Sequence, residues 1–240
     1  MKLTANLMHF KELNDRVRAC ADTNITIESC IGQRYIASGL SNKKITIHGT
    51  PGNALGAYLN GAAVTVYGNA QDAIGDTMND GVITVHGSCG DAPGYAMRGG
   101  KIYIKGSVGY RAGIHMKAYR DKLPVLVIGG SAGSFLGEYQ AGGVIVVLGM
   151  NAGGIPPIGN FCGTGMYGGK IFLRCDTPPR GLPNQVIVQK ADDETLGEID
   201  GYLDEFCAAF SKSKEEILRK PFYVLTPNTK NPYKQLYTQN

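Results

Sequence analysis

The chain repeats one short pattern at a constant step of 19 residues: ITIHG at 45–49, VTVYG at 64–68, ITVHG at 83–87 and IYIKG at 102–106. In each copy two aliphatic residues alternate with polar or aromatic ones. That alternation is the two-residue period of a β-strand with one buried face. A fixed period near 20 residues predicts a stack of repeat units, in which each unit contacts mainly its two neighbours.

Glycines follow the same step in two columns. The first column closes the strand pattern, and we expect it to supply a positive φ where the chain turns. The second column lies seven residues further on and marks another bend. The first comprises Gly49, Gly68, Gly87, Gly106, Gly130 and Gly149, and the second comprises Gly56, Gly75, Gly94, Gly113, Gly137 and Gly163.

The step lengthens at two places. The aliphatic position of Ile102 recurs at Leu126 after 24 residues, and that of Ile145 recurs at Ile171 after 26 residues. Insertions in a stacked repeat fall on loops of one face, which is often the binding face. We therefore expect partner contacts in the insertions 115–124 and 150–162 and in a tail that begins at Pro221. The candidate contact residues are His115, Met116, Tyr119, Asn160 and Phe161.

Units this short have no room for a crossover helix between parallel strands. The pattern therefore predicts an all-β solenoid, a parallel β-helix of about seven coils, with short helices at both ends. We expect an N-terminal helical cap at 1–23, the β-helix at 24–190, and a C-terminal helix with an extended docking tail at 191–240. Helical spacing of apolar residues places that last helix between Asp192 and Phe210.

No constellation of catalytic, cofactor-binding or metal-binding residues is assigned. His48 and His86 are two units apart, about 10 Å, which is too far to share one metal. The loop Gly130–Gly133 resembles a phosphate loop but is followed by another strand pattern, not a helix. Asp72 and Asp91 share a column, although two acids alone make a poor catalytic case. The residues favour a scaffold or interaction domain.

Composition excludes several classes of protein. Apolar residues make up 43% of the chain, enough for a sizeable core, and the net charge of +4 comes from scattered residues rather than a nucleic-acid patch. The start resembles no signal peptide, and no window of about 18 residues is continuously apolar. The six cysteines form no C-x-x-C pair. We expect a cytoplasmic protein with reduced thiols, bound neither to nucleic acid nor to a membrane.

Three segments carry a resemblance to a known family: GQRYIASGL at 32–40, GTPGNALGAYLNG at 49–61 and GNAQDAIGDTMNDG at 68–81. They resemble the GXGXG domain that closes the large subunit of glutamate synthase, and the resemblance covers about residues 24–175. It implies a right-handed parallel β-helix without an active site of its own. The chain then looks like a stand-alone, non-catalytic structural subunit of an oxidoreductase complex.

The resemblance also implies partners. They are a class II glutaminase subunit and an FMN-dependent glutamate synthase subunit, which together convert 2-oxoglutarate to glutamate with glutamine as nitrogen donor. FMN, an iron–sulfur cluster and NAD(P)H or ferredoxin are expected on those partners, and no cofactor is expected on this chain. A homo-oligomer is compatible with the sequence.

Two alternatives stay open. One is the β-helix subunit of formylmethanofuran dehydrogenase, whose coils read GxxGxxMxGG; Met78 and Met97 match that pattern in part. The other is a free-standing ligand-binding or polysaccharide-active β-helix. It would need an exposed aromatic or acidic ladder along one face, and we expect none from the sequence.

Overall fold

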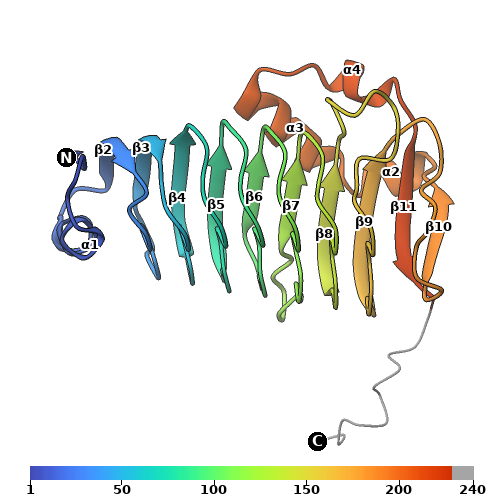
Figure 1. Cartoon of the computed structure of the whole chain (residues 1–240), viewed down its shortest axis with the longest axis horizontal. Coiled ribbons are helices and arrows are strands. Elements are labelled where there is room, and N and C mark those ends of the chain that lie inside the picture. The colour runs from blue at the N-terminus through green and yellow to red at the C-terminus, as the bar shows by residue number, and fades with distance from the viewer. Residues whose placement is uncertain (229–240) are drawn as a thin grey trace, which may run out of the picture.

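The computed structural model describes residues 1–228, which form an 11-stranded, mostly parallel sheet that is not closed (Figure 1). The strand order is β1 to β9, then β11, then β10. The strands are β1 (Lys2–Thr4), β2 (Asn24–Ile31), β3 (Lys44–Thr50), β4 (Asn60–Tyr67), β5 (Asp80–Val85), β6 (Lys101–Ile104), β7 (Val125–Ile128), β8 (Ala141–Val147), β9 (Gly168–Arg174), β10 (Val186–Lys190) and β11 (Phe222–Pro227). The helices are α1 (Phe10–Ala19), α2 (Asp193–Gly197), α3 (Asp200–Phe210) and α4 (Lys214–Leu218).

The register of the parallel strands confirms the steps read from the sequence. Ile45 pairs with Val64, and the same position continues through β5 to Ile102 in β6. The lengthened steps appear as the pairs Ile102–Leu126 and Ile145–Ile171. Both insertions therefore keep the same side chains facing the core in the strands that follow them. A slip of one residue would turn those side chains to the other face of the sheet.

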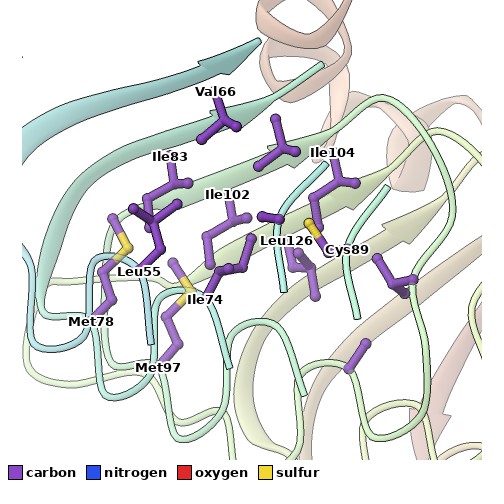
Figure 2. Close-up of a cluster of buried hydrophobic side chains, with 14 of the residues drawn as sticks. Leu55, Val66, Ile74, Met78, Ile83, Cys89, Met97, Ile102, Ile104 and Leu126 are labelled. Carbon is purple, nitrogen blue, oxygen red and sulfur yellow. The ribbon is translucent and has the colours of Figure 1, made fainter. Parts of the chain in front are cut away.

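The core lies between the sheet and the segment by which each unit returns. Inward side chains of the strands, such as Ile83 and Ile102, are fully buried and face Ile74, Met78 and Met97 of the return segments (Figure 2). The return segments also stack on one another through isolated parallel bridges, Ala70–Cys89–Val108–Ala132–Ile158. Burial of each large aliphatic side chain stabilises the stack by about 1.5–3 kcal/mol.

The first glycine column follows the strands, but our expectation of a positive φ at each member is wrong for three of them. Gly49, Gly68 and Gly149 have positive φ, whereas Gly87, Gly106 and Gly130 do not. At these three positions the reason for glycine is close approach between units. A Cβ on Gly106 would lie 2.8 Å from the carbonyl oxygen of Gly87, closer than real Cβ atoms come.

The second glycine column combines both constraints. Its members all have φ between +63° and +72°: Gly56, Gly75, Gly94, Gly113, Gly137 and Gly163. A Cβ on Gly75 would also lie 2.4 Å from Cδ1 of Ile102 in the core. All six positions therefore need glycine for the backbone conformation, and all except Gly94, where the nearest atom would be 3.7 Å away, also need it for packing.

The N-terminal segment is only partly helical. The expected helix spans Phe10–Ala19, with Leu13 and Val17 buried. Before it, β1 pairs in parallel with β2, and Leu7, which lies within the segment predicted to be helical, is 90% exposed. A strand thus occupies part of the segment predicted as a helical cap.

The C-terminal segment differs more from the prediction. The helix expected from Asp192 is divided into α2 and α3, with Asp192 capping α2 by accepting a hydrogen bond from the Thr195 backbone N–H at 2.9 Å. The segment Phe222–Pro227 of the predicted tail is extended, as expected, and it docks on this chain's own sheet. That segment is β11, which lies antiparallel between β9 and β10 and completes the sheet. The rest of the predicted tail, 229–240, lies outside the described residues.

A second apolar cluster covers the outer face of the C-terminal half of the sheet. Val127, Val146 and Phe172 of β7 to β9 are fully buried there, against Leu203 and Phe206 of α3. Figure 1 shows α3 lying over this half. The strands β7 and β8 contain the continuous apolar runs VLVI and VIVV. Such runs are typical of strands that are covered on both faces.

Candidate interaction surface

Each repeat unit turns a tight corner around its second-column glycine, and non-glycine residues there also adopt positive φ. Residues two places after the glycine do so at Tyr58, Thr77, Ala96, His115 and Tyr139. Residues two places before it do so at Ala54, Ala73, Ala92, Arg111, Phe135 and Phe161. Left-handed backbone costs a non-glycine residue about 1–2 kcal/mol. Hydrogen bonds between units hold it in place, for example from His115 N to Glu138 O at 2.9 Å.

The corners place aromatic rings on the surface. His115 lies between two tyrosines, with its ring centroid 5.9 Å from that of Tyr95 and 5.2 Å from that of Tyr139, on which it stacks. In a neighbouring row, the rings of Phe135 and Phe161 stack at 5.0 Å. Our expectation that no exposed aromatic ladder exists is therefore wrong. The rings come from separate units, so their alignment depends on both insertions keeping the units in phase.

The first insertion folds back against earlier units. Tyr119 and Lys122 exchange two backbone hydrogen bonds, of 3.1 and 3.0 Å, which close a tight turn. The Lys122 ammonium then reaches the Asp80 carboxylate at 2.9 Å. The loop is thereby fixed beside the corners of the preceding units.

Two open hollows lie on either side of Tyr119. One, of about 370 Å³, is lined by Ala96, Arg98, His115, Lys117 and Tyr119. The other, of about 340 Å³, is lined by Asn60, Asn79, Arg98, Tyr119, Arg120, Asp121 and Lys122. Because both contain Arg98 and Tyr119, they form one continuous surface. We call it the insertion surface, and it comprises Tyr95, Arg98, His115, Lys117, Tyr119, Arg120 and Tyr139.

The insertion surface has an excess of positive charge. Within residues 1–228, no salt bridge joins Arg98 or Lys117 to a carboxylate. The guanidinium of Arg120 lies 5.2 Å from the Tyr119 ring centroid, a cation–π contact. Asp121 is the acidic residue that lines the second hollow.

The five predicted contact residues separate in the structure. His115 and Tyr119 lie together on the insertion surface, and Asn160 and Phe161 are exposed in the corner after the second insertion. Met116 is fully buried, so it cannot touch a partner, and its prediction is wrong. It belongs to a column of buried methionines with Met78 and Met97, each three residues after a second-column glycine. The 19-residue spacing of these methionines is the sequence signal that could have predicted the burial of Met116.

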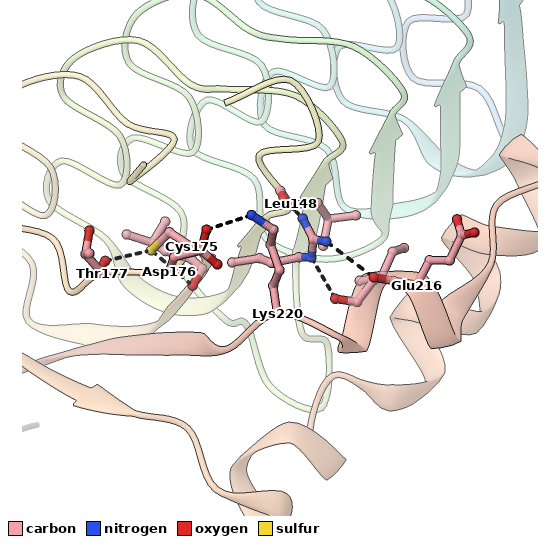
Figure 3. Close-up of polar contacts among 9 residues, drawn as sticks. Leu148, Cys175, Asp176, Thr177, Glu216 and Lys220 are labelled. Carbon is pink, nitrogen blue, oxygen red and sulfur yellow. Dashed lines mark hydrogen bonds and ion pairs between the residues drawn. The ribbon is translucent and has the colours of Figure 1, made fainter. Parts of the chain in front are cut away.

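Polar contacts of Arg174 and Asp176 join β9 to α4 and to the second insertion (Figure 3). Arg174 donates hydrogen bonds to the carbonyl oxygens of Leu148, Glu216 and Ile217 at 3.1, 3.3 and 2.6 Å. Asp176 accepts from the Lys220 ammonium at 2.7 Å, and its backbone N–H donates to Gly154 O. These contacts tie the insertion, β9 and α4 together, and burial lowers the pKa of the Arg174 guanidinium.

The histidine and aspartate columns have structural roles. His48 and His86 are separated by the ring of Tyr67, with centroid distances of 5.1 and 4.4 Å, as their spacing predicts. Asp91 accepts a hydrogen bond from Tyr110 N at 2.8 Å, so the acid holds the next unit. Asp72 does the same for Asp91 N at 2.9 Å. No group of three metal-ligating side chains occurs among residues 1–228.

The six cysteines are free thiols, and five of them are buried. Burial raises the pKa of Cys30 to about 11 and that of Cys162 to about 12. Within the described part of the chain, no helix is both long enough and apolar enough to span a membrane.

This geometry defines a stacked-repeat protein with a basic and aromatic surface beside its first insertion. A model of the GXGXG motif family matches residues 12–228, and the chain belongs to this family. The chain is 42% identical over 249 residues to an uncharacterized protein of Methanocaldococcus jannaschii, covering 98% of this chain and 95% of the relative.

A solved structure has a similar fold. It is the formyltransferase/hydrolase complex FhcABCD of Methylorubrum extorquens in complex with methylofuran. The TM-score is 0.64 at 20% identity, over 85% of this chain and 73% of the matched chain. At this identity the likeness concerns the fold alone.

Proposed function

We propose that the chain is a stand-alone, non-catalytic scaffold subunit of a glutamate synthase-type complex. It holds a class II glutaminase subunit and an FMN- and iron–sulfur-containing synthase subunit together. The observation that carries this proposal is the GXGXG family match over residues 12–228. The segments 32–40 and 49–61, which resemble the glutamate synthase domain in order and flanking residues, favour this complex.

In this proposal the stacked units are the coils of a right-handed parallel β-helix of about seven coils. The continuous parallel register from β1 to β9 supports it, as do the bridges of the return segments. Right-handed crossovers between parallel strands are the rule. A rigid stack suits a scaffold, because it fixes the distance between surfaces at its two ends.

FMN, the iron–sulfur cluster and the electron donor, NAD(P)H or ferredoxin, belong to the partner subunits in this account, in the cytoplasm. Reconstitution tests it. Purified glutaminase and synthase subunits should form glutamate from glutamine and 2-oxoglutarate efficiently only when this chain is added, and the chain alone should be inactive. Equal activity without the chain, or a flavin spectrum of the chain itself, would contradict the proposal.

A subunit of a formylmethanofuran dehydrogenase-type complex is the second candidate. The fold similarity to a chain of the FhcABCD complex favours it, as do the buried methionines Met78 and Met97 at the second-column corners. The partners distinguish the two candidates. Molybdopterin or tungsten subunits bound to the native chain would support the second.

A further inference from the structure

We propose that the insertion surface is the docking site for an acidic segment of a partner protein. The inference rests on the proposed function as a subunit, and it adds which face of the chain is used and what chemistry the partner presents there. Unpaired cations, exposed aromatic rings and two adjoining hollows occur together at the first insertion, and the inference begins from this observation.

The charges point to a negatively charged occupant. Arg98, Lys117 and Arg120 face this surface without a carboxylate partner among residues 1–228, whereas Lys122 is neutralised by Asp80. Against the free carboxylate of Asp121, the three cations leave an excess of two positive charges. Elsewhere among residues 1–228, Lys101, Lys170, Lys214 and Lys220 each form an ion pair with a carboxylate.

The aromatic side chains point to a protein. Tyrosine and arginine are enriched where interfaces bind most tightly, because they combine a large apolar area with a polar group. Tyr119 is 50% exposed and Tyr139 is 39% exposed, although both are fixed by neighbouring contacts. The stack of His115 on Tyr139 and the contact of Arg120 with the Tyr119 ring hold the two tyrosines in place before binding, which lowers the entropy lost on association.

The shape favours an extended segment over a compact ligand. The two hollows meet at Arg98 and Tyr119 and are open, so a chain can lie across both while each accepts a side chain. A nucleic acid fits less well. Three unpaired cations neutralise only about three phosphates, which gives weak, salt-sensitive binding.

The fixed insertion turn makes the site specific to this part of the repeat. The regular units have no equivalent of the loop, and the Lys122–Asp80 pair holds it across the corners of two earlier units. Asn60 and Asn79 continue the column of Arg98 and Lys117 and supply polar groups along the same line.

Site-specific photo-cross-linking tests the proposal in the native complex. A benzophenone amino acid replaces Tyr119 in the full-length chain, and a matched control replaces Tyr67, which is 49% exposed on the outer face of the sheet. We expect the Tyr119 probe to cross-link to a peptide rich in Asp and Glu in a partner subunit. The double charge reversal R98E/K117E should reduce that yield about tenfold.

Three controls keep the result interpretable. K44E/K105E makes the same change in charge on the sheet face and should leave the yield unchanged, and R98K/K117R should retain it. Melting temperatures of all variants verify folding. Cross-links from Tyr67 alone, to a peptide without acidic residues, or to nucleic acid would overturn the inference while leaving the subunit role intact. A chain that purifies without any partner would overturn both.

Discussion

Lys122 and Asp80 form an ion pair of 2.9 Å although 42 residues separate them in the chain. Asp80 begins the strand β5, and Lys122 lies in the first insertion, two units later. The pair therefore joins the insertion to a part of the repeat that it does not follow in sequence. The same loop carries Tyr119, so the geometry of the insertion surface depends on this contact.

Substitution of Lys122 by Met should free the loop without unfolding the stack. Both partners are partly exposed, so we expect the stability to fall by less than about 1 kcal/mol. Amide hydrogen exchange in 118–123 should become faster, while exchange in β5 and β6 stays slow. Lys2→Met, which removes the exposed pair with Glu28, is the matched control and should leave 118–123 unaffected. Unchanged amide exchange in 118–123 of the Lys122 variant would show that the turn is stable without the ion pair to Asp80.

Substitution of Gly75 by Ala should be much more costly than that of Gly39 by Ala. Both residues have nearly the same φ, +65° and +66°, so the backbone strain of an alanine is shared. A Cβ at Gly75 would clash with Ile102 in the core, whereas at Gly39 nothing lies within 4 Å. We expect a further loss of about 1–3 kcal/mol at Gly75. Denaturant unfolding measures the difference, and equal losses would refute the packing role of the second column.

Truncation of Phe206 to Ala should detach α3 from the sheet. The ring is fully buried among the valines of β7 and β8, and its loss should cost about 3–5 kcal/mol. Leu218→Ala, at a residue that is 42% exposed on α4, should change stability little. Chemical denaturation of the two variants provides the comparison; similar stabilities would mean that the helices contribute little to the fold.

The thiols should differ sharply in reactivity. Cys20 is partly exposed, whereas the other five cysteines are buried. A thiol reagent at neutral pH should modify Cys20 quickly in the native protein and all six cysteines after denaturation. Rapid native modification of Cys89 or Cys162, identified by peptide mass, would contradict the buried positions.

Buried thiols should also make the fold sensitive to alkali. Burial raises the pKa of Cys30 from 9.0 to about 11, so the unfolded chain loses this proton at a lower pH than the folded chain. The stabilising contribution is complete below pH 9 and is lost as the pH rises toward 11. The melting temperature should fall in that range, and Cys30→Ser should make the fall shallower. An identical pH profile for the variant would exclude a role for Cys30.

The stack could be predicted from the sequence because the core residues of successive units must recur at matching positions. Aliphatic residues at constant steps could only be neighbours across units, so the pairs Ile102–Leu126 and Ile145–Ile171 followed from spacing alone. The sequence predicted the position of the insertion surface, as His115 and Tyr119 show. It did not predict the three-dimensional shape of that surface. The contact of Lys122 with Asp80 depends on the path of a loop that carries no periodic signal.

The sequence predicted an extended C-terminal segment but not its place in the sheet. The segment of β11 reads FYVLTP, and its aromatic and β-branched residues are typical of a strand, but nothing in it names the strand to which it pairs. It becomes a sheet strand because β9 offers an open edge, some 50 residues earlier in the chain, to which it can pair antiparallel. Such long-range pairing depends on tertiary context, which a local pattern does not contain.

The composition of the native complex tests the proposed function most directly. The full-length chain, tagged and purified from its source under mild conditions, can be analysed by native mass spectrometry and by its visible spectrum. We predict that it elutes with a class II glutaminase and an FMN-containing synthase subunit, and that flavin remains with the latter when the complex is dissociated. Elution of the chain alone with bound flavin, or with molybdopterin or tungsten subunits, would contradict the account.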